Sequence, residues 1–359
     1  MRVLLSVDTV GGVWTYALEL TNALARYDVE VVLAALGEPL REEQRTAALA
    51  SPALRVHALD CDLEWMDEPW GDVERSGEWL LEIAAADDVD LVHLNGFAHG
   101  SLPWAVPVLV AAHSDVCSWH EAVRREPAGS EWDRYRDAVE QGLAGADAVV
   151  APTRAMLFAL ERCYPFDGER RVIPNGRDPH RFRPLAKEPF VLSAGRLWDE
   201  AKNAAALDRL APSLPWPVLL AGPGETGAAR RLGRVSDRAL ARLLGRATIF
   251  AEPARYEPFG LAALEAGLSG CALLLGDIPS LREVWGDAAL FVDPDDDAAI
   301  GRELHRLIAE PELRTELARR ARKRALEHSP ERMGHEYVEH YEQLLAEEPA
   351  ARRRAERAA

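Results

Sequence analysis

Short apolar runs, each followed by a loop and a helical pattern, recur along this chain and restrict the folds that it can adopt. The first run is RVLLSV at Arg2–Val7, followed by the loop DTVGG and a helix-forming stretch, and VEVVLAAL supplies the next run. The same order returns at FVLSAG, PVLLAG and ATIFAE. Strand, loop and helix in this succession are typical of a doubly wound α/β sheet, whose ligands bind beyond the carboxyl ends of the strands. We therefore predict α/β domains of this type.

The composition excludes several classes of function. A net charge of −17 argues against general electrostatic binding to nucleic acid or to an anionic bilayer. No apolar run approaches the length of a membrane span, and Met1 leads directly into the first strand without a signal-like segment, so we expect a cytoplasmic protein. The four cysteines show no metal-type spacing. Because the net charge is strongly negative, any phosphate-binding site must be local, built from a few cations and backbone amides.

The stretch ATIFAEPARYEPFGLAALEAG places two glutamates around a predicted strand-to-helix turn. ATIFAEPA has the pattern of a buried strand and LAALEAG that of a helix, so residues 257–260 form the turn. Backbone N–H groups at a helix start bind anions and hydroxyls, and Gly260 lets a ligand approach the main chain. Glu257 and Glu265 lie up to roughly 12 Å apart at helical rise, too far to share a proton. They would hold two parts of one long ligand, such as a nucleotide sugar; alternatively, Glu257 is an N-cap and Glu265 is solvated.

The segment EPFGLAALE resembles the E-x7-E signature of retaining glycosyltransferases of family 4. The resemblance implies the α/β GT-B fold, with two facing Rossmann-like doubly wound domains and an interdomain cleft. It implies that Glu257 and the backbone N–H groups after it hold the donor sugar, and that Glu265 holds the ribose hydroxyls. Those N–H groups belong to Phe259, Gly260 and Leu261.

Two cations follow the strand FVLSAG and precede a helix predicted to begin near Asn203. Arginine can grip two phosphate oxygens at once and lysine adds a point charge, so Arg196 and Lys202 together suit a diphosphate. They resemble the G-R-L…E-K element of the family, in which both cations neutralise the leaving diphosphate. Their spacing is one residue longer than the common form, so we expect a bulged loop. The alternative is a pair of solvated surface cations.

Two features of the N-terminal half fit the same family. Gly11 and Gly12 lie between the first strand and its helix, where the family brings backbone close to the donor diphosphate and the acceptor. The alternative is a tight loop without a ligand. His113 follows the strand VPVLVAA, where the family has a histidine that hydrogen-bonds the donor sugar or supports the reaction centre.

The resemblance also implies the domain organisation. A proline-rich segment without periodicity, VIPNGRDPHRFRPLAKEPF, predicts the interdomain linker. A late amphipathic helix with Tyr337 and Tyr341 on one face is expected to return to the first domain, and Pro330 stands where the family has a tryptophan. The predicted boundaries are 1–170 for an acceptor domain, 171–187 for the linker, 188–328 for a nucleotide-sugar domain, 329–347 for the returning helix, and 348–359 for a disordered tail.

A second glycine pattern admits another interpretation. Gly222, Gly224 and Gly227 form G-x-G-x-x-G after a strand, as in dinucleotide-binding proteins, but no acidic residue follows at the expected distance. We interpret it as a loop near the nucleotide, and by resemblance we place Arg234 and Val235 beside the base. An NAD-dependent oxidoreductase remains an alternative that NAD binding would test.

The function predicted from the sequence is metal-independent transfer of a hexose from a nucleoside-diphosphate sugar to an acceptor hydroxyl, with retention. His113, Arg196, Lys202 and Glu257 are the candidate catalytic residues. UDP-glucose is the first choice of donor and GDP-mannose the second; no separate cofactor, metal, nucleic acid or membrane anchor is expected. The alternatives are a nucleotide-sugar epimerase or phosphorylase on the same fold, and a non-catalytic nucleotide-sugar binding protein.

Overall fold

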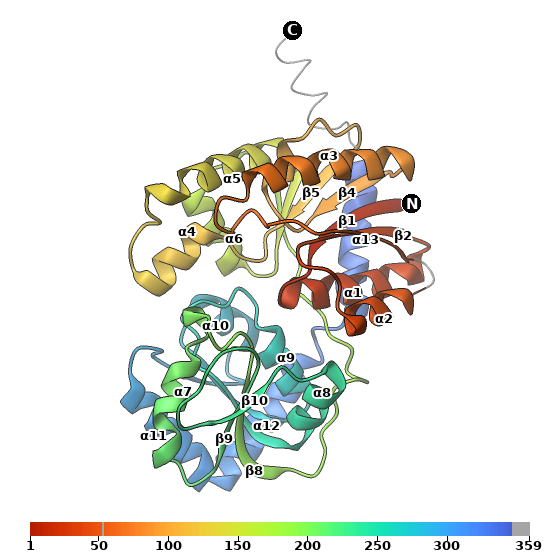
Figure 1. The fold of residues 1–359 in the computed structure, drawn as a ribbon. Helices are drawn as coiled ribbons and strands as arrows, with labels where there is room; N and C mark the ends of the chain where they lie inside the picture. Colours follow the sequence, from red (N-terminus) through yellow and green to blue (C-terminus); the bar gives the residue numbers. More distant parts are fainter. Residues whose placement is uncertain (52–53, 347–359) are drawn as a thin grey trace. The chain divides into compact units, whose positions relative to one another are not determined.

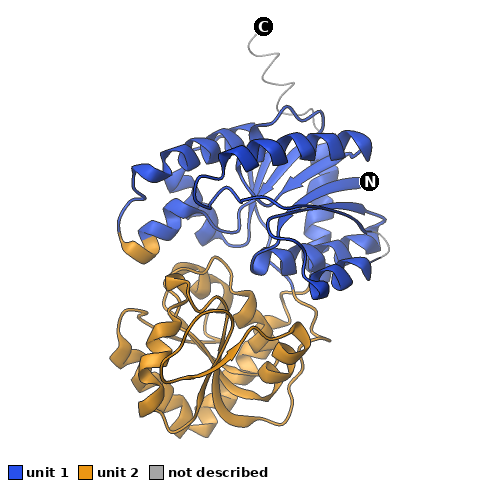
Figure 2. Cartoon of the chain, viewed as in Figure 1, with its two compact units in different colours: residues 1–121, 126–176, 330–359 blue, residues 122–125, 177–329 orange. Residues whose placement is uncertain are grey.

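The computed structural model describes residues 1–51 and 54–346, and they divide into two compact units (Figures 1 and 2). Unit 1 comprises Met1–Glu121, Glu126–Gly176 and the segment from Pro330, and unit 2 comprises Ala122–Arg125 and Arg177–Ser329. The main division thus falls within the predicted linker. The tail predicted at 348–359 lies outside the described residues.

Unit 1 is built on a parallel sheet of seven strands in the order β3-β2-β1-β4-β5-β6-β7. The strands are β1 (Arg2–Asp8), β2 (Glu30–Leu36), β3 (Leu54–Leu59), β4 (Leu91–Leu94), β5 (Val108–Ala111), β6 (Ala148–Ala151) and β7 (Glu169–Val172). Val3 of β1 pairs with Val31 of β2 on one side and with Leu91 of β4 on the other. The strand order reverses between β1 and β4, which is where a doubly wound sheet binds its ligand.

Helices cover both faces of this sheet, with α3 and α5 on one face and α1 and α13 on the other (Figure 1). The helices are α1 (Gly12–Leu24), α2 (Glu42–Leu49), α3 (Trp70–Ala86), α4 (Val116–Trp119), α5 (Asp133–Gly145), α6 (Arg154–Cys163) and α13 (Pro330–Ala346). Shorter helical turns are η1 (Ala25–Tyr27), η2 (Ala98–Ser101), η3 (His120–Arg124) and η4 (Ser130–Trp132).

The C-terminal helix α13 belongs to unit 1 and packs on α1. It begins at Pro330, and proline suits a first helical position because the N–H it lacks would have no helical acceptor there. Gly334 permits the close approach, since a Cβ there would lie 2.7 Å from the Cβ of Ala23. Tyr337 and Tyr341 are both buried, and the hydroxyl of Tyr337 accepts a hydrogen bond of 2.6 Å from Tyr16 on α1. The helix is thus fixed to unit 1 by packing and by a buried polar contact.

Unit 2 is built on a parallel sheet of six strands in the order β10-β9-β8-β11-β12-β13. The strands are β8 (Glu188–Ala194), β9 (Val218–Ala221), β10 (Arg230–Gly233), β11 (Ala247–Glu252), β12 (Ala272–Gly276) and β13 (Leu290–Val292). The helices are η5 (Glu200–Lys202), α7 (Ala204–Leu210), η6 (Ala211–Ser213), α8 (Asp237–Arg246), α9 (Leu261–Leu268), α10 (Pro279–Trp285), α11 (Asp297–Ala309) and α12 (Pro311–Ala325). The order reverses between β8 and β11, so their carboxyl ends form the switch point of this unit.

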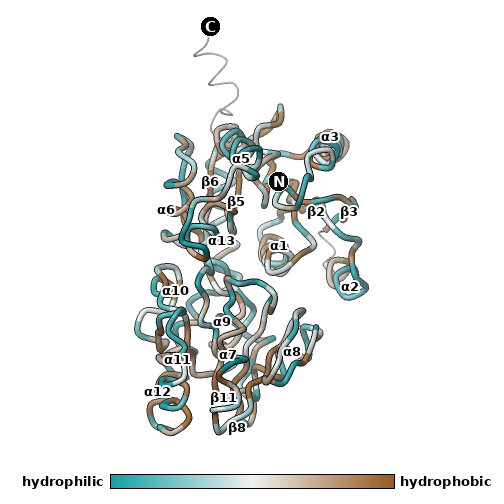
Figure 3. Tube along the Cα trace, turned by 60° about the vertical axis from the view of Figure 1, so that its left-hand side comes forward, coloured by the Kyte–Doolittle hydropathy of each residue, from teal (hydrophilic) through white to brown (hydrophobic). Residues whose placement is uncertain are grey.

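Two hydrophobic cores sandwich the sheet of unit 2. Successive strand residues face opposite sides, so Phe250 of β11 lies in the core under α8, α9 and α10, while Ile249 and Ala251 lie in the core under α7 and α11. Hydrophobic positions concentrate on strands such as β5 and β11, whereas α12 is largely hydrophilic (Figure 3). No helix within 1–51 and 54–346 is long and apolar enough to cross a bilayer.

Candidate active site

The predicted residues of unit 2 lie in the loops after β8 and β11, the two strands at the switch point. Arg196 and Lys202 follow β8, and Glu257 follows β11. Because parallel neighbours end at the same edge of the sheet, these loops meet although they are more than fifty positions apart in the sequence.

Lys202 lies between two carboxylates at this edge. Its Nζ donates a hydrogen bond of 3.0 Å to Oε1 of Glu252 and another to Oε2 of Glu257. The side chain of Lys202 is 20% exposed, that of Glu257 12% and that of Glu252 1%. The three charges are therefore largely withdrawn from water while the ammonium stays reachable.

This enclosure shifts the pKa of each group. Burial lowers the pKa of Lys202, but the two carboxylates outweigh that effect and raise it above its usual value, so the lysine stays charged. Burial by itself raises the pKa of Glu257. The nearby positive charges of Lys202 and Arg196 have a larger effect in the opposite direction, so the pKa lies below its usual value. For Glu252, burial dominates and raises the pKa to about 7, with a further increase from the charge of Glu257.

Arg196 lies closer to solvent. Its guanidinium donates to Oδ2 of Asp199 at 2.8 and 3.2 Å and lies over the ring of Trp198, and its side chain is 40% exposed. Asp199 also accepts a hydrogen bond from the backbone N–H of Ala201, at the start of η5. The arginine is thus oriented by its own loop and stays partly open to solvent.

The loop that carries these cations ends in the short helical turn η5, which includes Lys202. Asn203 closes this turn with a φ of 52°, a left-handed conformation that asparagine tolerates. Its side-chain amide donates to the carbonyl oxygens of Pro253 and Pro294. These bonds fix the turn that carries Lys202 at the sheet edge, and α7 begins at Ala204, directly after Asn203.

Glu257 also contacts the start of α9. Its Oε1 accepts a 3.0 Å hydrogen bond from the backbone N–H of Gly260, which has a φ of 90°. The side chain of Phe259 is 2% exposed and packs edge-on against His328, and Leu261 packs on the same core. Both side chains are thus structural, and their main-chain groups are what they can offer a ligand.

Glu265 lies in a buried ion pair. Its Oε1 is 2.6 Å from Nη2 of Arg177, and both side chains are less than a tenth exposed. Arg177 comes from the PNGRD segment and lies over the ring of Phe182. The solvated alternative for Glu265 is therefore wrong, and a ribose would have to share this carboxylate with Arg177.

The glycine pattern after β9 has a packing explanation. A Cβ at Gly222 would lie 1.7 Å from the carbonyl oxygen of Gly195, and one at Gly224 would lie 2.7 Å from Cβ of Leu197. These glycines therefore let the loop press against the segment that carries Arg196. Beyond β10, Arg234 is exposed, whereas Val235 packs on the hydrophobic core.

In unit 1 the predicted residues follow β1 and β5. Gly11 and Gly12 are exposed, and Gly11 has a φ of 79° at the cap of α1, a helix without an acidic residue in its first turn. Open N–H groups at such an end favour an anion. His113 lies in the loop after β5.

A hydrogen-bond chain orients His113. Its Nε2 donates to Oδ1 of Asn95 at 2.7 Å, and the amide group of Asn95 donates to the carbonyl oxygen of Ser6. The ring packs edge-on against Tyr16 with a centroid distance of 4.5 Å. Burial lowers the pKa of His113 to about 4, so the imidazole is neutral near pH 7.

Sequence reasoning missed three partners of the predicted residues. Glu252 was placed only at the end of a predicted strand and Arg177 only in the predicted linker, and Asn95 was not singled out. A polar residue at the carboxyl end of a buried strand was the available signal for Glu252 and Asn95.

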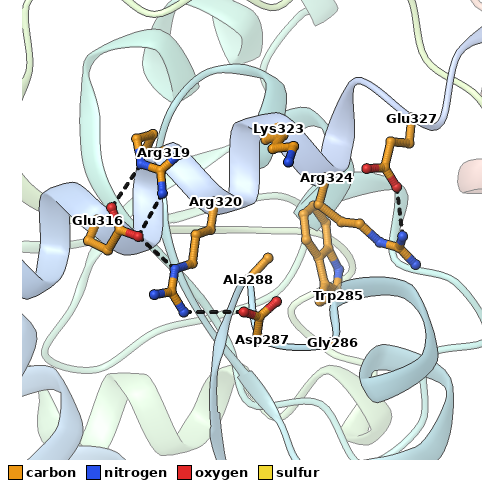
Figure 4. A pocket seen from close by; sticks show the side chains of 10 residues that line it. All are labelled: Trp285, Gly286, Asp287, Ala288, Glu316, Arg319, Arg320, Lys323, Arg324 and Glu327. Carbon is orange, nitrogen blue, oxygen red and sulfur yellow. Dashed lines mark hydrogen bonds and ion pairs between the residues drawn. The ribbon is translucent and has the colours of Figure 1, made fainter.

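A separate pocket of about 570 Å³ in unit 2 is lined by α12 and the turn after α10 (Figure 4). Its charged groups are largely paired with one another: Glu316 with Arg319 and Arg320, Asp287 with Arg320, and Arg324 with Glu327. Among the described residues that line it, none belongs to the predicted site.

Two family models match the chain in the expected order. Glycosyltransferase family 4 matches residues 10–181, and glycosyl transferases group 1 matches residues 226–324, so together they cover more than half of the chain. The glycogen synthase of Mycobacterium tuberculosis is 27% identical over 77% of this chain and 69% of its own length. The D-inositol 3-phosphate glycosyltransferase of Xylanimonas cellulosilytica is 26% identical over 87% of each.

Solved structures agree on the fold. Sucrose-phosphate synthase from Thermosynechococcus elongatus has a TM-score of 0.81 at 20% identity, over 96% of this chain and 99% of that one. Anabaena HepE, solved in complex with UDP-glucose, has a TM-score of 0.74 at 15% identity, over 96% and 100%. The predicted fold class and family are thereby confirmed, and the chain belongs to the glycosyltransferases of the family 4 type, as a hexosyltransferase with the GT-B fold.

Proposed function

We propose that this hexosyltransferase takes its sugar from a nucleoside-diphosphate donor and attaches it, with retention and without a metal ion, to a hydroxyl of a small-molecule or glycan acceptor. The observation that carries the proposal is the Lys202 ammonium, held by Glu252 and Glu257 beside the start of α9. An ammonium has three N–H donors. The two carboxylates take two of them, which leaves the third for an oxygen of the diphosphate.

The chemistry asks mainly for stabilisation of the leaving group. Cleavage of the bond between sugar and phosphate leaves charge on the diphosphate and an oxocarbenium-like sugar. In unit 2, Lys202, Arg196 and the N–H groups of Phe259 and Leu261 are the groups suited to that charge, since the N–H of Gly260 already donates to Glu257. A leaving phosphate oxygen takes the proton of the acceptor hydroxyl, so the new bond forms on the face from which the diphosphate departs. No carboxylate pair at glycosidase separation is then required.

The remaining predicted residues take the roles that the family resemblance assigns. His113 would hydrogen-bond the donor sugar as a neutral imidazole, and Glu265 would hold the ribose together with Arg177. Gly11 and Gly12 would let the start of α1 approach the diphosphate. Arg234 and Val235 would lie beside the base.

UDP-glucose is the donor that we propose first, and HepE, which shares the fold, binds UDP-glucose in its crystals. GDP-mannose is the second choice, since an O-antigen chain mannosyltransferase of Escherichia coli is 35% identical over 32% of this chain. Metal independence and a cytoplasmic location stay predictions.

Calorimetry with a panel of nucleoside diphosphates and their sugars, in EDTA, tests the proposal. We expect the wild type to bind one base preferentially and Arg196→Ala to bind it at least tenfold more weakly, because a charge-assisted phosphate contact is lost. Arg209→Ala is the matched control, because Arg209 pairs with Asp297 on the surface of the same unit. Binding that requires a divalent metal, or no binding at all, would contradict the proposal.

An acceptor screen with the donor so identified tests the reaction itself. We expect a glycoside whose anomeric configuration, read by NMR, matches that of the donor. A free epimerised sugar or a sugar phosphate would instead indicate the epimerase or phosphorylase alternative.

A further inference from the structure

Glu252 is a buried carboxylate to which the proposed reaction gives no role beyond holding Lys202. It ends β11, its side chain is 1% exposed, and its Oε1 accepts a hydrogen bond from Lys202. Its Oε2 is buried and has no hydrogen-bond partner among the described residues. A buried oxygen in this state is costly to keep ionised, which requires an explanation.

The charges around Glu252 do not balance when every group is ionised. Lys202 carries one positive charge between two carboxylates, and Arg196 is already paired with Asp199. The cluster of Lys202, Glu252 and Glu257 therefore has a net charge of −1. A diphosphate brings two further negative charges to this point, and like charges in a partly buried site repel each other strongly.

A proton on Glu252 would remove both problems. Protonated, its Oε2 becomes a donor, and Glu257, whose carboxylate binds the same Lys202 ammonium, is the neighbouring acceptor. Lys202 keeps its contact with Oε1, and the cluster becomes neutral. Burial already raises the pKa of Glu252 to about 7, so little free energy is needed to add this proton near neutral pH.

We propose that Glu252 takes up a proton from solvent when a nucleoside-diphosphate sugar binds, so that donor affinity is coupled to pH through this residue. The inference rests on the proposed function, since it requires a diphosphate beside Lys202. It makes Glu252 a positioning residue, which holds Lys202 and adjusts the charge of the site without touching the sugar.

The groups that face Glu252 are few. Lys202 approaches from η5 and Glu257 from the loop before α9, while Arg196 acts on Glu257 from the loop after β8. Leu275 lies beside Glu252 on β12, and β8 ends in Ser193 and Ala194 without a charge. The coupling can therefore be assigned to Glu252 by one substitution.

The test is calorimetry of UDP-glucose binding at pH 8 in HEPES and in Tris, whose ionisation enthalpies differ. The phosphates of a nucleotide sugar do not titrate in this range, so a dependence of the binding enthalpy on buffer reports protons taken up by the protein. We expect about 0.5 to 1 proton per bound donor for the wild type, and a Kd that rises up to about tenfold for each pH unit above 7.

The isosteric variant Glu252→Gln should bind UDP-glucose with no proton uptake and with a Kd almost independent of pH between 7 and 9. Glu316→Gln, on the surface helix α12, should behave as the wild type. Binding by the wild type without proton uptake would overturn the inference and leave the proposed function standing. Proton uptake that persists in Glu252→Gln would assign it to another group and also overturn the inference. If no nucleoside-diphosphate sugar of the panel binds, the proposed function fails and the inference fails with it.

Discussion

The loops at the carboxyl ends of the strands hold charge in unit 2, whereas in unit 1 they hold glycine and a neutral histidine. After β8 and β11, Lys202 is enclosed by Glu252 and Glu257. After β1 and β5, Gly11 offers backbone, and His113 is oriented by Asn95 with its pKa lowered to about 4. The same sheet topology thus supports two kinds of site, one set by opposing charges and the other by shape and hydrogen bonding. Substitutions should therefore affect the two units differently.

The largest effect is expected from Lys202→Met. With the ammonium removed, the leaving diphosphate would lose a cation that we propose neutralises it, and kcat should fall by about 10²- to 10³-fold. Two enclosed carboxylates also lose their partner, so Tm should fall as well. Steady-state kinetics and thermal unfolding measure the two effects.

The double variant Lys202→Met with Glu252→Gln separates stability from catalysis. It removes one of the two unpaired charges, so it should recover part of the Tm without recovering kcat. If Lys202→Met alone keeps kcat within tenfold of the wild type, Lys202 has no role in stabilising the leaving group.

A smaller effect is expected from His113→Ala in unit 1. Loss of the hydrogen bond that we propose between His113 and the donor sugar should lower kcat by about 10²-fold, at every pH from 5 to 8, because the histidine is neutral throughout that range. Rate profiles of the wild type and the variant should therefore run parallel above pH 5. A variant profile that converges on the wild type toward pH 5 would mean that His113 titrates and that the contrast between the units is wrong.

His113 should also contribute to the pH dependence of stability. Its pKa is about 4 when folded, against 6.5 for an unperturbed histidine, so between these values the unfolded chain binds more protons. Stability should then fall as pH falls from 6.5 toward 4. The decrease in Tm over this window should be smaller in His113→Gln.

Glu252 in unit 2 should change stability with pH in the opposite direction to His113, and Glu252→Gln tests this. The pKa of Glu252 rises from 4.5 to about 7 on folding, so as pH rises the unfolded chain loses this proton before the folded chain does. The free energy of unfolding therefore decreases between pH 4.5 and 7 and stays lower above pH 7. The shift corresponds to at most roughly 3 kcal/mol. Glu252→Gln should therefore raise Tm at pH 8 and leave it nearly unchanged at pH 4.5, as thermal unfolding at the two pH values would show. An equal change in Tm at both pH values would mean that the substitution acts through packing and not through the charge of Glu252.

The sequence predicted the fold well because its signals are local. Alternating strands, glycine loops and helices define each sheet, and Lys202, Glu257 and His113 each follow the carboxyl end of a strand, where a doubly wound sheet binds its ligands. Ion pairs are different: Arg177 and Glu265 are 88 positions apart, and their contact depends on how α9 packs. Glu252 has the appearance of an ordinary strand end until β11 is placed beside β8. Partners of a site residue depend on tertiary structure and cannot be read from local patterns.

The smallest effect is expected from Arg196→Lys, which keeps the charge and removes the planar guanidinium. Arg196 is 40% exposed and paired with Asp199 within its own loop, so solvent screens its charge. Replacing the guanidinium by an ammonium should therefore reduce binding and activity less than removing Lys202 does. We expect the Kd for UDP-glucose to rise less than about tenfold, with kcat nearly unchanged. Arg196→Ala should have the larger effect on Kd, because only that variant removes the charge as well. If both variants lose binding equally, bidentate geometry and not charge is what Arg196 supplies, and the site of unit 2 is more shape-dependent than its ion pairs indicate.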